Sequence, residues 1–333
     1  MRSSGRYQRR RSTKSKIINA VAVIAIVSAV AAGGKIIWDG MHDKKDITMQ
    51  NGKDIETDVK IPSTEGEITE GSEAETESTS DIPTPSVDIN EPEAYEDISK
   101  NIDLSGLTGY QAQYPGLYAE KQEVIPVESK TVYLTFDDGP SKNTAAVLDA
   151  LDRCGVKATF FVVTGGKSDE LVEENLKAVA ERGHNIGIHT YSHKYDEIYQ
   201  SVDTFLEDID KVNRKVYEIT GKRCSVYRFP GGSKNSYNKA VRDDIKAEME
   251  RRGFTAFDWN SSTQDAEGKK FTADQLADNA ISTFYDRKRV VVLAHDGSGQ
   301  KVTPDSIEKI VNYAKENGYT FGVLDNSCGE LVF

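Results

Sequence analysis

Residues 131–140 read TVYLTFDDGP, in which six apolar, β-branched or aromatic residues precede two acids, a glycine and a proline. A short run of this composition is typical of a buried β-strand, and aspartate, glycine and proline favour a turn after it. Taken alone, such a turn only redirects the chain. Asp137 and Asp138 become candidates for chemistry if other polar groups gather at the same place.

Strand and helix signals alternate over the rest of the chain. Strand-like runs occur at residues 131–136, 158–163, 185–189, 225–228, 255–259, 290–294 and 319–324. The clearest helical pattern has apolar residues at three-to-four spacing from Val202 to Ile219 and stops at Gly221. Thr303 is predicted to cap the N-terminus of the last helix.

This alternation predicts an α/β fold. About seven strand–helix units in roughly 210 residues indicate a parallel sheet with helices outside it. Such a sheet forms either a distorted or incomplete (β/α) barrel or an open doubly wound sheet. No glycine-rich dinucleotide turn follows the first strand, which favours the barrel.

Polar groups follow several of these strands at the point where each strand ends. After the third to sixth strands come, in order, His189 with His193, Arg228 with Gly231, Trp259 with Asp265, and His295. In a parallel barrel all these positions lie on the C-terminal face, where such folds build active sites. We therefore expect one active site at this face.

The histidines point to the type of chemistry. Of five histidines, three lie at these strand ends, while His42 lies in an acidic segment and His184 is interpreted as structural. Two histidines four residues apart and one carboxylate are a suitable ligand set for a catalytic divalent metal. A second carboxylate can then accept a proton from water, and an opposite histidine can protonate a leaving group. The residues alone indicate metal-assisted hydrolysis of an acyl bond or a similar reaction.

The motifs resemble those of the NodB-type polysaccharide deacetylases, which form carbohydrate esterase family 4. The resemblance covers about residues 124–324. It rests on Thr135–Pro140, the His-Thr-x-x-His pair, Arg228-Phe229-Pro230 and Leu293-Ala294-His295. It looks closest to Gram-positive bacterial members, which include peptidoglycan N-acetylglucosamine deacetylases. The resemblance implies a metal-dependent hydrolase that removes N-acetyl groups from a cell-wall glycan.

The resemblance also implies a role for each matching residue. Asp137 matches the general base, and the ligands of one divalent metal ion match Asp138, His189 and His193. That ion is usually zinc, with cobalt or manganese as alternatives. The other matches are Arg228, which orients the base; His295, the general acid; Asp265, which tunes the acid; Gly231, whose backbone N–H meets the oxyanion; and Leu293 and Trp259, on the substrate side. The partner is an N-acetylated glycan, and neither an organic cofactor nor nucleic acid is expected.

Three positions depart from the family pattern. Lys194 stands where proline is common, Gly231 where an aromatic residue is common, and Ala266 where tryptophan is common. Lys194 should alter loop shape more than ligation, and Ala266 should alter substrate range more than reaction type. A backbone donor at Gly231 needs no side chain.

Other functions stay open on the sequence alone. A deacetylase of chitin oligomers or an esterase for O-acetyl groups of the xylan type would use the same chemistry. A catalytically inactive glycan-binding protein is a different class. The complete set of ligands, base and acid argues against that class, since binding a glycan requires none of them.

The N-terminal part carries a membrane signal. Residues 1–16 hold seven cationic side chains and no acid, and the next 18 residues hold no charge. An uncharged run of this length can cross a bilayer core, and cationic flanks stay on the cytoplasmic side. We predict a basic cytoplasmic tail (1–16) and a transmembrane anchor (17–38), with the rest outside the cell membrane. The alternatives are a cleaved signal peptide, which gives a secreted protein, and a basic arm for nucleic acid, which the apolar run disfavours.

Residues 39–104 are predicted to be an acidic disordered linker before the deacetylase domain, 105–333. The segment holds 19 acids against five bases and has little apolar periodicity. The chain has three cysteines and no Cys-x-x-Cys pair, so it has no disulfide framework. One bridge with a free thiol and three thiols both stay open.

Overall fold

The structure is a computed structural model and describes residues 94–333. The predicted tail, the predicted anchor and most of the predicted linker lie outside these residues. Within the described part of the chain, no helix has the length and apolar composition that crossing a membrane requires. The anchor stays a prediction.

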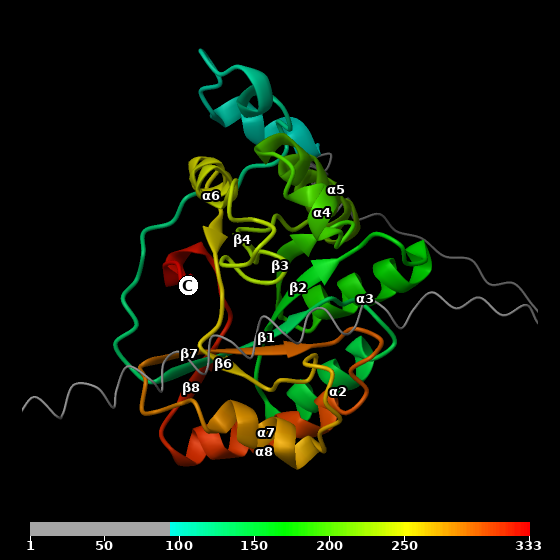
Figure 1. Ribbon diagram of the computed structural model, residues 1–333, viewed down its shortest axis with the longest axis vertical. Helices are drawn as coiled ribbons and strands as arrows, with labels where there is room; N and C mark the ends of the chain where they lie inside the picture. Colours follow the sequence, from blue (N-terminus) through cyan, green and yellow to red (C-terminus); the bar gives the residue numbers. More distant parts are fainter. Residues whose placement is uncertain (1–93) are drawn as a thin grey trace, which may run out of the picture. The chain divides into compact units, whose positions relative to one another are not determined.

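Eight parallel strands form one sheet (Figure 1). They are β1 (Thr131–Asp137), β2 (Thr159–Val163), β3 (Asn185–Thr190), β4 (Val226–Tyr227), β5 (Thr255–Ala256), β6 (Ser261–Ser262), β7 (Arg289–His295) and β8 (Thr320–Gly322). The order is β5-β4-β3-β2-β1-β7-β6, and β8 pairs with the first half of β1. No pairing joins β5 to β6 among the described residues, so the barrel is incomplete, as predicted.

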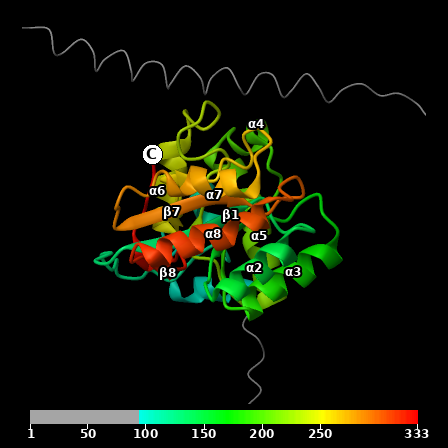
Figure 2. The ribbon, with the colours of Figure 1, turned by 90° about the horizontal axis from the view of Figure 1, so that it is seen from below.

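Helices follow most of the strands and cover the outside of the sheet. They are α2 (Thr144–Cys154), α3 (Asp169–Glu181), α4 (Tyr195–Ile198), α5 (Val202–Thr220), α6 (Arg242–Arg251), α7 (Ala273–Ile281) and α8 (Thr303–Glu316), with 3₁₀ helices η1 (Tyr95–Asn101), η2 (Gly109–Ala112) and η3 (Asn326–Cys328). The helix predicted from its apolar spacing is α5, which a capping box opens at Ser201 and a left-handed Gly221 closes. Figure 2 shows α8 beside α2, and the two helices are in contact.

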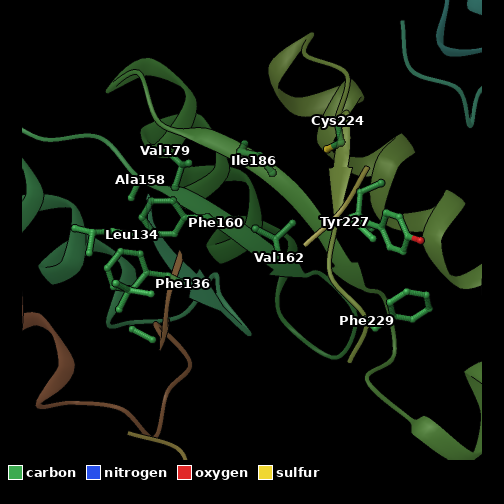
Figure 3. Packing of buried hydrophobic residues seen from close by; sticks show 14 of the residues in the cluster. Leu134, Phe136, Ala158, Phe160, Val162, Val179, Ile186, Cys224, Tyr227 and Phe229 are labelled. Atoms are coloured by element: carbon green, nitrogen blue, oxygen red, sulfur yellow. The ribbon is translucent and has the colours of Figure 1, made fainter. Parts of the chain in front are cut away.

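Successive side chains of a strand point to opposite faces of the sheet, and this divides the core into two layers. Even-numbered residues of β1, such as Phe136, pack among the helices in a large cluster that includes Phe160 of β2 (Figure 3). The rings of these two residues stack with centroids 5.3 Å apart, and burial of each side chain contributes about 2 kcal/mol. Odd-numbered residues face the barrel interior, where Tyr133 packs with Phe161. The interior layer thus leads directly to Asp137 at the end of β1.

Both ends of the sheet are bonded to other parts of the chain. Directly after β5, Phe257 forms a parallel bridge with Leu331, whose N–H donates to the carbonyl of Ala256 at 3.3 Å. In β6, the hydroxyl of Ser261 donates to the carbonyl of Ala280 in α7 at 2.9 Å.

Two local predictions are wrong. The predicted strand 255–259 ends at residue 256, and the two-residue β6 follows it. Thr303 does not cap α8, because the N-cap is Val302 and Thr303 is the first helical residue. The Thr303 hydroxyl donates instead to Asp265 Oδ2 at 2.6 Å. The interpretation of His184 as structural is confirmed, since its Nδ1 accepts the Ala158 N–H at 3.1 Å.

Ordered structure begins before the predicted boundary at residue 105. Figure 1 shows η1 in cyan against α5, and its Tyr95 is 4% exposed. The Tyr95 hydroxyl donates to Asp210 Oδ1 at 2.9 Å and accepts from Asn213 Nδ2 at 2.8 Å. A single buried tyrosine in an acidic segment is too short a signal to be separated from a linker by sequence.

Candidate active site

Strand β3 and the turns that follow β1 and β3 bring together three side chains of metal-ligating types, which form a candidate metal-binding group. Asp138 Oδ1 lies 3.2 Å from His193 Nε2 and 3.6 Å from His189 Nε2. The ligand atoms of all three residues lie within 4.8 Å of one another. Asp138 and His193 have φ values of 71° and 55°, which residues other than glycine rarely adopt. The backbone therefore accepts local strain where these side chains converge.

The chemistry of this group fits a divalent cation. His189 Nδ1 lies 2.9 Å from the Arg228 carbonyl oxygen, which places the ring proton on Nδ1 and turns the Nε2 lone pair toward Asp138. Burial lowers the pKa of His189 to about 3, so the ring is neutral at neutral pH. Asp138 Oδ1 is buried and has no hydrogen-bond partner among the described residues. A buried oxygen without a partner is costly, and a cation held by these residues would satisfy it.

Beside this group, Asp137 is paired with a buried arginine. The fully buried Arg228 guanidinium donates to Asp137 Oδ1 (2.7 Å), Thr135 Oγ1 (2.8 Å) and the carbonyls of Phe257 (2.8 Å) and Asp258 (3.1 Å). The other oxygen of Asp137, Oδ2, faces His189 Nε2 at 4.0 Å. Burial raises the pKa of Asp137 above its ordinary value, although the charges of Arg228 and His295 oppose this. One oxygen is thus fixed, and the other points toward the metal-binding group.

His295 stands at the end of β7, in register with Asp137 on β1. The ring Nδ1 of His295 lies 2.8 Å from Asp265 Oδ1, and the backbone N–H of His295 donates to Asp265 Oδ2 at 2.9 Å. Thr303 donates to the same Oδ2. Burial alone lowers the pKa of His295, but the hydrogen bond and negative charge of Asp265 raise it to about 9. His295 is therefore held protonated at neutral pH.

The remaining predicted residues surround this centre at different depths. Gly231 is exposed, and its N–H donates to no described group. Leu293 pairs with Thr135, two residues below the pair of Asp137 and His295, so it lies in the interior layer. The ring of Trp259 lies 5.8 Å from the Arg228 guanidinium. It packs on the ring of Phe333, not on the metal-binding group.

The turn that carries Asp138 is held by two residues that sequence reasoning missed. Lys167 donates to the Asp138 carbonyl at 2.6 Å, and burial lowers the pKa of Lys167 to about 8. Asp296 accepts the Thr144 hydroxyl at 2.5 Å, and its carbonyl accepts the Ser141 hydroxyl at 2.6 Å. Burial raises the pKa of Asp296 to about 6. Neither residue was given a role from the sequence, although Asp296 directly follows His295 at the end of the strand predicted at 290–294.

The loop between His189 and His193 is held by Asp208 of α5, which sequence reasoning also missed. This buried carboxylate accepts the Tyr191 N–H at 2.6 Å, the Ser192 N–H at 3.0 Å and the Thr190 hydroxyl. An acid three residues after Phe205, on the apolar face of a helix, was a signal that could have found it.

Asp208→Ala is expected to weaken Zn²⁺ binding by about 10–100-fold, because the loop would no longer hold His193 in its left-handed conformation. Calorimetric titration of the full chain with Zn²⁺ measures this change directly. The control is Glu218→Ala, which removes an exposed acid from the same helix. Unchanged Zn²⁺ affinity in Asp208→Ala would show that the loop keeps its shape without this carboxylate.

Comparison with known proteins agrees with this geometry. Residues 125–250 match the family described as polysaccharide deacetylase. The Bacillus subtilis protein YheN, assigned as a polysaccharide deacetylase, is 32% identical over 203 residues, which cover 60% of this chain and 68% of the relative. A peptidoglycan-N-acetylglucosamine deacetylase of Bacillus cereus is 30% identical over 198 residues, which cover 58% of this chain and 69% of the relative.

A solved structure is also similar to this chain. The crystal structure of the catalytic domain of peptidoglycan N-acetylglucosamine deacetylase from Eubacterium rectale matches with a TM-score of 0.58 and 36% identity. The match covers 62% of this chain and 94% of that domain.

Proposed function

This chain belongs to the polysaccharide deacetylase family, and from that premise we propose that it hydrolyses the N-acetyl group of N-acetylglucosamine in peptidoglycan. The observation that carries the proposal is the arrangement of three parts at one end of the sheet. These are a set of metal ligands, a buried carboxylate with one oxygen turned toward them, and a protonated histidine in register with that carboxylate.

Each residue of the site has its own role in the proposed reaction. Asp138, His189 and His193 would hold a divalent cation, which we expect to be zinc, and that cation would supply Lewis acidity toward the acetamide carbonyl and water. Asp137 accepts a proton from the attacking water through Oδ2, while Arg228 holds Oδ1. The Gly231 N–H donates to the oxygen on which negative charge develops. Protonated His295 donates to the departing nitrogen, and the products are acetate and a free amine.

Asp265→Asn is expected to move the high-pH limb of kcat/KM to lower pH. In the native chain this limb follows deprotonation of His295 near pH 9. Loss of the Asp265 carboxylate removes the hydrogen bond and the charge that raise this pKa most, so burial, which lowers it, is opposed only by the smaller effects of Asp137 and Asp138. A profile of kcat/KM from pH 5 to pH 10 measures the displacement. An unmoved limb would mean that another group supplies the proton.

The same variant links pH to stability. The pKa of His295 is higher in the folded chain, about 9, than its ordinary 6.5. The interaction therefore stabilises the fold fully below about pH 6.5, and its contribution is lost as pH rises through 9. The difference in unfolding free energy between the native chain and Asp265→Asn should become smaller as pH rises from about 6.5 to 9.

We also propose that residues 17–38 anchor the protein and that the catalytic domain acts outside the membrane. The support is the charge pattern, with cations before an uncharged run and acids after it. Protease added to intact cells that express the full chain should cut the catalytic domain. A domain that is degraded only after cell lysis would contradict the proposal.

The function is tested by release of free amine from N-acetylated peptidoglycan by the full chain. We expect release with added Zn²⁺, none with chelator, and recovery when Zn²⁺ is restored. Chitin oligomers and O-acetylated xylan, assayed in parallel, test the other substrates of the same chemistry. Release from xylan alone would make the protein an esterase, and no product from any substrate would contradict the deacetylase.

A further inference from the structure

An aromatic ring fills the space beside Gly231. A Cβ atom added at Gly231 would lie 3.0 Å from Cε2 of Tyr195 and 3.3 Å from its hydroxyl oxygen. Tyr195 opens α4, which begins two residues after His193. The site thus has a ring next to position 231, supplied by a different loop from the one that carries Gly231.

Tyr195 belongs to a row of rings that runs from the metal ligands to the surface. Its centroid lies 5.2 Å from that of His193 and 5.4 Å from that of Tyr237, with an angle of 84° between the two tyrosine planes. Tyr195 is half-buried, whereas Tyr237 is 55% exposed. Tyr237 thus presents an exposed ring at the outer end of a row that begins at His193.

Hydrogen bonds fix the backbone around these two rings before any ligand arrives. The Tyr199 hydroxyl, at the end of α4, donates to the carbonyl of Pro230 at 2.8 Å. Asn235 Nδ2 donates to the carbonyls of Pro230 and Gly232 at 3.1 and 2.9 Å, and its Oδ1 accepts the Tyr237 N–H at 2.9 Å. A surface fixed in this way loses little conformational entropy when it binds.

The chemistry of the surface suits a sugar ring. A pyranose has faces of C–H groups and an edge of hydroxyls, so it packs on an aromatic ring while its hydroxyls meet polar groups. Tyrosine offers both an apolar ring and a hydroxyl. We propose that Tyr195 and Tyr237 form a binding wall for a sugar that neighbours the acetylated residue in the glycan chain. The choice of a glycan rests on the proposed function, and the position of the wall rests on its continuity with His193.

The test compares a chain substrate with a small one. For full-length Tyr237→Ala with Zn²⁺, we expect KM for the β-1,4-linked N-acetylglucosamine tetramer to rise about tenfold, with kcat changed less than twofold. Hydrolysis of 4-nitrophenyl acetate should not change, because it has no second sugar. Tyr237→Phe should keep KM near the native value, since the ring remains.

The control is Tyr285→Ala, which removes a 74% exposed tyrosine before β7, at the opposite end of that strand from His295. An unchanged KM in Tyr237→Ala, or an equal rise in Tyr285→Ala, would overturn the inference. Calorimetric binding of the tetramer separates this result from failure of the proposed function. Tetramer that binds the native chain without turnover, and binds Tyr237→Ala about tenfold more weakly, would support the wall, while the activity itself is decided by amine release from peptidoglycan. A native chain that does not bind the tetramer would overturn the wall, and amine release from peptidoglycan by the same chain would show that the proposed function stands without it.

Discussion

Asp137→Asn is expected to lower kcat for amine release by about 10³-fold, because asparagine cannot accept a proton from water. The substitution keeps the size of the side chain and an oxygen for Arg228. KM should change little, since Asp137 is a base and not a ligand of the substrate. The measurement is steady-state release of amine by the full chain at saturating Zn²⁺.

Measuring metal affinity distinguishes a role of Asp137 as the base from a role as a metal ligand. Asp137 Oδ2 lies 4.0 Å from His189 Nε2, whereas Asp138 Oδ1 contacts both histidines more closely. Calorimetry should therefore give nearly native Zn²⁺ affinity in Asp137→Asn and a large loss in Asp138→Asn. The matched control is Asp149→Asn, an exposed acid on α2. Loss of Zn²⁺ binding in Asp137→Asn would assign Asp137 to the ligand set.

Arg228→Met is expected to reduce the free energy of unfolding by about 3–5 kcal/mol, because removal of one partner leaves an uncompensated charge in the core. The Arg228 side chain is 0% exposed, and Asp137 is 3% exposed. Two backbone carbonyls and the Thr135 hydroxyl would also lose their donor. Urea unfolding of the full chain, followed by tryptophan fluorescence, measures the change.

Two further variants show whether the charge causes the loss. Arg242→Met removes a partly exposed arginine that pairs with the exposed Asp243, and should change stability by less than about 1 kcal/mol. Adding Asp137→Asn to Arg228→Met removes the unpaired carboxylate, so the double variant should recover part of the stability. A double variant as unstable as the sum of the two single variants would indicate that packing, not charge, is responsible.

The fold could be predicted because its main elements have strong local signals. β1 and β7 are continuous apolar runs, and α5 has a regular apolar face with a cap at each end. β6 was missed because two residues, Ser261 and Ser262, carry no period, and pairing with β7 alone makes them a strand. Thr303 has the residue type of a cap, but the helix already includes it, and its hydroxyl donates to Asp265.

The candidate site was predictable to the extent that its residues lie at strand ends. Asp137 and His295 end β1 and β7, and His189 lies one residue before the end of β3, so the parallel sheet alone brings them together. Residues that act from outside a strand end were missed. Asp208 reaches the loop from the middle of α5, and Tyr195 meets Gly231 only through the fold. No spacing in the sequence records such contacts.

The coverage of β5 by Leu331 has a consequence for solubility. An unclosed parallel sheet ends in strands whose free N–H and C=O groups can pair with another chain and start aggregation. Here the C-terminal segment bonds to the outer side of β5, and the β6 end is tied to α7. The last few residues thus cover the free edge of β5 at the open side of the barrel. Any fusion or truncation that displaces them would expose this edge for pairing with a second copy of the chain.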